Sequence, residues 1–109
     1  MKNLDVIRST KTVSSTIAEL LVAKEQDGRA DRYLRDLKSR LRVFERRFGS
    51  RIIHGVEANE IDSFLRELGG GPLNRNNYRR IASVLFGFAV KHRYALKNPL
   101  REVKVANVD

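Results

Sequence analysis

The chain has 109 residues, a length that suits one domain. It has no cysteine, which excludes a disulfide scaffold and a thiolate metal site. Hydrophobic residues make up 41% of the sequence and charged residues 32%, a balance that excludes wholesale disorder. The formal net charge of +9 favours a polyanionic partner, most often nucleic acid.

The first predicted element is a helix over residues 14–26, where apolar side chains recur at helical spacing. Thr16 followed three residues later by Glu19 matches a capping box, and Asp27-Gly28 supplies a stop. Residues 1–12 show no periodicity. We therefore predict that they form a flexible lead-in to a domain spanning residues 13–98.

The strongest helix prediction covers residues 30–48, which carry one narrow apolar stripe and a basic face opposite it. The stripe steps by three and four residues through Leu34, Leu37, Leu41, Phe44 and Phe48, and Gly49 ends the helix. The opposite face holds Arg32, Arg35, Lys38, Arg42 and Arg46. A solvated face usually mixes signs, with acids at i,i+4, so this nearly single-signed face favours contact with nucleic acid over simple solvation.

A short apolar segment at residues 52–56 follows, which we interpret as a buried connector with His54 in a structural or surface position. The third predicted helix covers residues 57–68. It buries Ile61, Phe64, Leu65 and Leu68 and exposes acidic side chains, so we expect it to face away from a polyanion. The glycines of residues 69–72 predict a plain flexible loop, because no P-loop pattern and no preceding strand accompany them.

The fourth predicted helix covers residues 75–94, with Asn74 as its N-cap. Its predicted core face consists of Tyr78, Ile81, Ala82, Leu85, Phe88, Ala89 and His92. Phe86 and Val90 fall off this face, so they are either partly exposed or in contact with a partner domain. Asn98-Pro99-Leu100 prevents any continuation of the helix, and Val103 and Val105 are predicted to lie in an extended tail.

The positive charge is concentrated in two segments rather than in a tail. Residues 29–51 carry a net charge of +6 and residues 75–104 a net charge of +7, whereas residues 52–74 between them carry −3. This distribution favours a folded basic surface. Because helix N-termini attract phosphate and because arginine and asparagine match base edges, we predict ten DNA-binding residues. They are Arg29, Arg32, Arg35, Lys38, Arg42, Asn74, Arg75, Asn76, Arg79 and Arg80.

Catalytic signals are missing from the sequence. It shows no carboxylate pair, no Ser/His/Asp constellation, no metal-ligand spacing and no cofactor motif, so we predict no catalytic residue, no metal and no cofactor. Tyr33 and Tyr78 lie on or beside apolar stripes, which favours structural roles over nucleophilic ones.

One alternative function is that of a helical protein–protein interaction domain that uses the acidic third helix, Phe86 and Val90. A helix-turn-helix regulator is disfavoured because the loop before Asn74 is too loose.

Five stretches in a fixed order also carry a family resemblance. They are Leu34 to Phe48-Gly49, Ile52-Ile53, Ile61-Asp62-Ser63-Phe64-Leu65, Tyr78 to Ala89, and Asn98-Pro99-Leu100. Over residues 14–105 the chain resembles the N-terminal core-binding, SAM-like domain of phage integrases, the tyrosine site-specific recombinases. The individual motifs are degenerate, so their order and spacing carry the resemblance.

The resemblance implies an all-α, four-helix SAM-like orthogonal bundle that clamps double-stranded DNA at a recombination half-site without cutting it. It also implies a separate C-terminal catalytic domain in the parent chain, with residues 99–109 as the start of the linker to it. Further recombinase protomers on the same DNA, a cytoplasmic location and no membrane contact are expected. Glu57 stands where a threonine commonly caps the third helix, and Asn74-Arg75-Asn76 stands where serine or threonine often begins the fourth. These departures leave the identity of the base contacts open.

Overall fold

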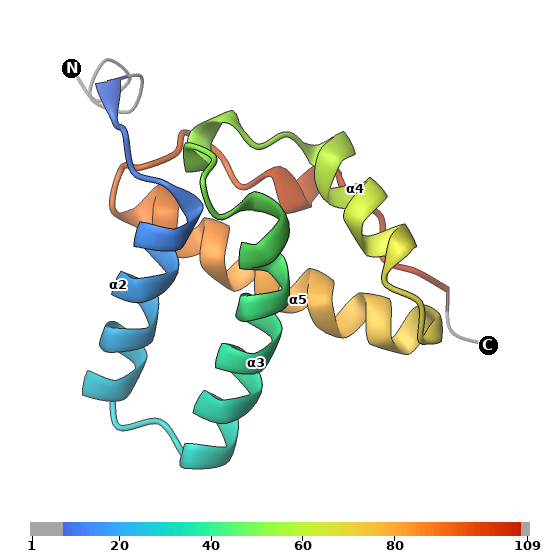
Figure 1. The fold of residues 1–109 in the computed structure, drawn as a ribbon, viewed down its shortest axis with the longest axis horizontal. Coiled ribbons are helices and arrows are strands. Elements are labelled where there is room, and N and C mark those ends of the chain that lie inside the picture. Colours follow the sequence, from blue (N-terminus) through green and yellow to red (C-terminus); the bar gives the residue numbers. More distant parts are fainter. Residues whose placement is uncertain (1–7, 108–109) are drawn as a thin grey trace.

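A computed structural model describes residues 8–107 and confirms an all-α bundle of four helices (Figure 1). The helices are α2 (Val13–Gln26), α3 (Asp31–Phe48), α4 (Ala58–Glu67) and α5 (Gly71–Lys91), with short 3-10 helices η1 (Ile53–Gly55) and η2 (Pro99–Glu102). Within residues 8–107 the sheet-like pairing is limited to one antiparallel bridge, between Thr12 and Ile52. None of the helices in this range is long and apolar enough to cross a lipid bilayer.

Helices α2 and α3 form an antiparallel hairpin, and α5 crosses it at a steep angle (Figure 1). Gly49, which follows α3, lies directly against the start of α2: a Cβ atom at this position would come within 2.6 Å of the Ser14 hydroxyl oxygen. The Ser14 amide donates a hydrogen bond of 3.0 Å to the Gly49 carbonyl. A side chain at position 49 would therefore crowd the Ser14 side chain, so glycine allows the end of α3 to lie close to the start of α2.

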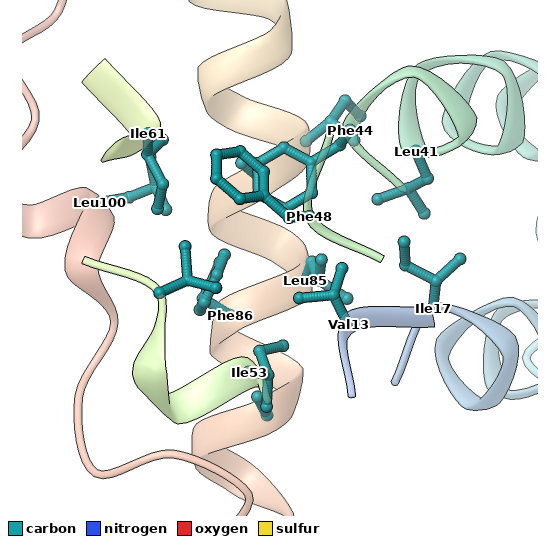
Figure 2. Packing of buried hydrophobic residues seen from close by; sticks show 14 of the residues in the cluster. Val13, Ile17, Leu41, Phe44, Phe48, Ile53, Ile61, Leu85, Phe86 and Leu100 are labelled. Atoms are coloured by element: carbon teal, nitrogen blue, oxygen red, sulfur yellow. The ribbon is translucent and has the colours of Figure 1, made fainter. Parts of the chain in front are cut away.

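An aromatic cluster occupies the centre of the bundle (Figure 2). The ring of Phe44 lies edge-on to Phe64, with centroids 5.3 Å apart, and edge-on to Phe86 at 6.0 Å. Phe48 lies 4.7 Å from Phe44. Edge-to-face pairs of this kind contribute beyond the burial of their area. The apolar stripe predicted for α3 therefore builds the core as expected, since its members from Leu37 onward are buried.

The prediction that Phe86 falls off the core face of α5 is wrong. Both Phe86 and its neighbour Leu85 have no exposed surface, because α5 is covered on two sides. In Figure 2 Leu85 points toward Val13 of α2, whereas Phe86 lies on the side of Ile53 and Leu100. Consecutive helical residues point about 100° apart, so two buried neighbours require two packed faces.

The second face of α5 is covered by the segment predicted to begin an interdomain linker. Pro99 and Leu100 are buried, and Val103, predicted to lie in an extended tail, is only 3% exposed. The Asn98 side chain donates to the Ser83 carbonyl at 3.0 Å and accepts from the Leu100 amide at 3.0 Å, which caps η2. The core therefore extends past the predicted boundary at residue 98. The predicted core residue His92 is exposed, and Tyr78 and Phe88 are half-buried.

Helix α5 begins four residues earlier than predicted, and Asn74 is not its N-cap. Gly70 is the cap, with φ of 77° in the left-handed region, and Pro72 stands in the first turn. Proline is favoured there because the missing N–H would have no intrahelical partner. The predicted flexible loop is thus partly helical, and the Asn74 side chain donates to the Gly69 carbonyl at 3.1 Å.

The N-terminal signals of α2 also differ from the prediction. Thr12 is the cap, accepting a hydrogen bond of 3.1 Å from the Ser15 amide, whereas Thr16 lies inside the helix and is fully buried. The predicted lead-in is anchored at its end, since the Lys11 carbonyl accepts from the Ile53 amide at 2.9 Å. The exposed His54 ring contacts the Ser9 carbonyl at 3.0 Å. Residues 1–7 of that lead-in lie outside the described residues.

The C-terminus of α5 closes with a Schellman motif formed around a non-glycine residue. The Tyr94 amide donates to the Ala89 carbonyl at 2.8 Å, and the Arg93 amide donates to the Val90 carbonyl at 3.1 Å. Arg93 takes φ of 64°, which is the left-handed conformation usually given to glycine. The helix therefore ends at Lys91, three residues before the predicted end.

Candidate nucleic-acid interface

The basic face of α3 is exposed, as the spacing predicts. Arg32, Arg35, Lys38, Arg42 and Arg46 are all exposed. Within residues 8–107 none of the five forms an ion pair; the arginines of α3 that do so are Arg40 and Arg47. Five cations without a neutralising partner on one helix face produce a strong local positive potential, which attracts anions in proportion to their charge.

A shallow open groove lies between the N-terminal parts of α3 and α5, with a volume of about 770 Å³. In Figure 1 these two parts diverge from the point where the helices cross. Arg32, Arg35 and Arg40 line the groove from α3, and Asn77 and Arg80 line it from α5. Asp36 is the acidic residue of its lining, so the charged side chains of the groove sum to +3. The tertiary structure thus brings together Arg32, Arg35 and Arg80 from the two basic segments of the sequence.

Three of the predicted DNA-binding residues are instead engaged in holding the backbone. Asn74 donates to Gly69, as described above. The Asn76 side chain donates to the Ala106 carbonyl at 2.9 Å and accepts from the Ala106 amide at 2.8 Å. The Arg79 guanidinium donates to the Val103 carbonyl at 2.9 Å and to the Leu100 carbonyl at 2.8 Å. Asn76 and Arg79 therefore fasten the C-terminal segment to α5 and are half-buried beneath it.

The remaining predicted residues lie outside the groove. Lys38 and Arg42 stay on the exposed face of α3, and Arg75 is half-buried on α5. The Arg29 guanidinium lies 4.7 Å from the centre of the Tyr33 ring, a cation–π contact that keeps its charge beside the mouth of the groove, where Tyr33 is a lining residue.

Sequence reasoning missed Asn77 and Arg40 as groove residues. Arg40 pairs with Asp36 one turn earlier, and its guanidinium lies 5.5 Å from the centre of the Tyr78 ring on α5. Its Nε atom is buried and has no hydrogen-bond partner among the described residues. Asn77 is three residues before Arg80, a spacing that places both on one helix face. That spacing is the sequence signal for Asn77, and it is hidden when Asn74 is taken as the N-cap of the helix.

The acidic residues of α4 are largely neutralised by arginines from outside the groove. The Arg47 guanidinium makes two hydrogen bonds of 3.1 Å to the Glu67 carboxylate, which lower the pKa of Glu67. Arg51 contacts Glu60 at 2.6 Å and lowers the pKa of that carboxyl in the same way. Glu57 and Asp62 line a different groove, which shares no residue with the basic one. The acidic and basic surfaces are therefore separate.

A polar contact group links the start of α2 to the end of α5. The Tyr94 hydroxyl donates to Glu19 at 2.6 Å, and the Lys11 ammonium contacts the other oxygen of that carboxylate at 2.6 Å. The Lys11 hydrogen bond, followed by that of Tyr94, lowers the pKa of Glu19. The same bond to Glu19 raises the pKa of Tyr94, which opposes its ionisation and disfavours a nucleophilic role. Tyr33 and Tyr78 likewise pack against apolar and arginine neighbours.

No protein-family model matches this sequence, and no curated protein and no solved structure matches it either.

Proposed function

We propose that this chain is a non-catalytic module that binds double-stranded DNA, of the kind found as the core-binding domain of integrase-like tyrosine recombinases. The assignment to the recombinase family rests on the resemblance described above. The assignment of DNA binding rests on the basic groove between α3 and α5. In this proposal the module holds a recombination half-site. A separate catalytic domain of the parent chain then breaks and rejoins the strands.

The unpaired arginines are the observation that carries the proposal. Arg32 and Arg35 from α3 and Arg80 from α5 line one groove and form no ion pair with any described residue. A cation that stabilised the fold would be expected to hold a carboxylate or a backbone carbonyl, as Arg47 and Arg79 do here. Guanidinium groups left free on a concave surface suit bidentate contacts with phosphate oxygens.

A duplex is favoured over a single strand because few aromatic rings are available for base stacking. Phe44, Phe48, Phe64 and Phe86 are buried, which is four of the five phenylalanines in the chain. Single-strand binding proteins stack successive bases on exposed aromatic side chains. The burial of Phe86 also removes one of the residues assigned to the alternative protein–protein interface, which further included Val90 and the acidic third helix.

The salt dependence of duplex binding tests the proposal. The longest dimension of the molecule is 45 Å, the length of about 13 base pairs, so a fluorescent duplex of about 20 base pairs is long enough. If about five basic side chains contact phosphates, the affinity falls roughly 500-fold between ~50 and ~200 mM salt. A flat salt response would refute the proposal. A single-stranded competitor of equal length is expected to bind more weakly.

Matched charge variants locate the interface. Arg35→Ala and Arg80→Ala each remove one groove cation, so each is expected to weaken binding and to reduce the slope of log affinity against log salt by about 0.9. Arg66→Ala is the control, because it removes the same charge from an exposed arginine on α4. Equal effects of all three variants would show that only total charge matters and would contradict an interface at the groove.

The recombinase assignment has its own test, in the reading frame that encodes the chain. A downstream region with an Arg…His-x-x-Arg…Tyr arrangement would support a parent recombinase. A different downstream domain would refute the recombinase assignment and leave DNA binding to be judged by the titrations.

A further inference from the structure

The three asparagines in the first half of α5 have different hydrogen-bonding states. Asn74 is bonded to Gly69, and Asn76 is bonded through both ends of its carboxamide to Ala106. The carboxamide of Asn77 makes no hydrogen bond with any described residue. Of the three, Asn77 is the one that lines the basic groove.

Asn77 is a neutral side chain among the arginines of the groove. It is flanked by Arg80 on the same helix face and lies across the groove from Arg32 and Arg35. The positively charged arginines attract the phosphates of a polyanion. A neutral carboxamide adds little to that attraction, but it presents one donor and one acceptor side by side.

That pair of groups matches one base edge in the major groove of DNA. Adenine presents the N7 acceptor beside the N6 amino donor, and asparagine binds both at once, whereas guanine presents two acceptors and is suited to arginine. An α-helix fits the major groove, and Leu73, one turn before Asn77 on the same face, is 63% exposed. The turn of α5 that precedes Asn77 is therefore open to solvent on this face.

We infer that Asn77 is the specificity-determining residue of the groove and that it reads an adenine in the major groove. This inference rests on the proposed binding of double-stranded DNA. It assigns base reading to Asn77 rather than to Asn74 or Asn76, whose carboxamides are occupied. It also divides the interface, with Arg32, Arg35 and Arg80 supplying affinity and Asn77 supplying sequence preference.

Selection from a randomised duplex library, followed by titration of single-base variants of the selected site, tests this inference. The 109-residue chain is expected to prefer adenine at one position by at least about fivefold. Replacing that adenine by 7-deazaadenine, which lacks the N7 acceptor, should abolish most of the preference. Asn77→Ala should bind both duplexes alike while keeping its affinity for a random duplex, and alanine at this helical position favours folding.

Asn59→Ala on α4 is the matched control, because this exposed asparagine lines the separate groove of Glu57 and Asp62 instead. It is expected to keep the adenine preference and the response to 7-deazaadenine. A preference that survives in Asn77→Ala, or an equal loss of affinity for every duplex in that variant, would overturn the inference. So would wild-type binding to duplexes without any base preference, although the proposed function would then stand. Failure of the wild type to bind any duplex would overturn both.

Discussion

Replacing Arg79 by alanine removes the side chain that fastens the C-terminal segment to α5. Its guanidinium donates to the carbonyls of Leu100 and Val103 at 2.8 and 2.9 Å, next to two of the buried residues that cover the second face of the helix. In the variant both carbonyls lose a charged donor, and the segment keeps only its apolar contacts and the bonds of Asn76 and Asn98. We expect Arg79→Ala to destabilise the fold.

The magnitude follows from the two bonds. A hydrogen bond to a charged group contributes about 1.5–3 kcal/mol, and a half-buried site allows water to replace part of each contact. We therefore expect a loss of about 2–3 kcal/mol in the free energy of unfolding. For a domain of this size that loss corresponds to a fall of roughly 10–20 °C in melting temperature. Arg79→Lys should lose part of this, because a single ammonium cannot hold two carbonyls in the geometry of the guanidinium fork.

Thermal and urea unfolding followed by circular dichroism measure the effect, with Arg80→Ala as the neighbouring control. Arg80 is exposed and forms no ion pair with a described residue, so its removal should change stability by less than about 0.5 kcal/mol. Sequence reasoning alone placed both arginines at the DNA, which would predict equal, small changes in stability. Equal melting temperatures for the two variants would refute the structural role of Arg79.

Three further substitutions test other parts of the fold. Phe86→Ala should cost about 3–5 kcal/mol in urea unfolding, and a small loss would show that the C-terminal segment does not cover that face of α5. Arg93→Gly should raise the melting temperature through a gain of roughly 0.5–1 kcal/mol, because glycine adopts φ of 64° without strain; an unchanged or lower value would contradict the Schellman geometry. The pKa of folded Glu19 is lowered by Lys11 and Tyr94, so its stabilising contribution is present above its ordinary value of 4.5 and is lost as the pH falls through the lowered pKa. Glu19→Gln should therefore reduce the fall of the urea midpoint between about pH 5 and pH 3, and an unaltered pH profile would argue against this contact.

The features predicted well from the sequence are those set by local periodicity. The bounds of α2, α3 and α4 agree with the predicted ranges to within one residue, because each of these helices packs one face and has a polar opposite face. The exposed basic face of α3 follows from the same spacing. A helix with one buried stripe determines its exposed residues directly, without knowledge of what covers it.

The errors concern features that depend on distant segments or on competing local signals. Phe86 was misplaced because the partner for the second face of α5 arrives from residues 98–103, which a helical wheel cannot include. The start of α5 was misplaced because three consecutive glycines favour a loop, whereas Gly70 and Pro72 in fact begin the helix. The candidate site was therefore found in part: Arg32, Arg35 and Arg80 were predicted, Asn77 was missed, and Asn76 and Arg79 were assigned to the wrong partner.

Adjacent residues in the same two turns of α5 have different roles. Asn76 and Arg79 hold the C-terminal segment, while Asn77 and Arg80 line the groove. Substitutions at 77 and 80 are thus free of the stability cost attached to 76 and 79, and the two pairs are suited to independent variation. A combinatorial library at positions 77 and 80 should yield mostly folded proteins with altered groove chemistry. The same diversity introduced at 76 and 79 should yield mostly unstable ones. The helix thereby keeps ligand preference open to change while the fold stays fixed.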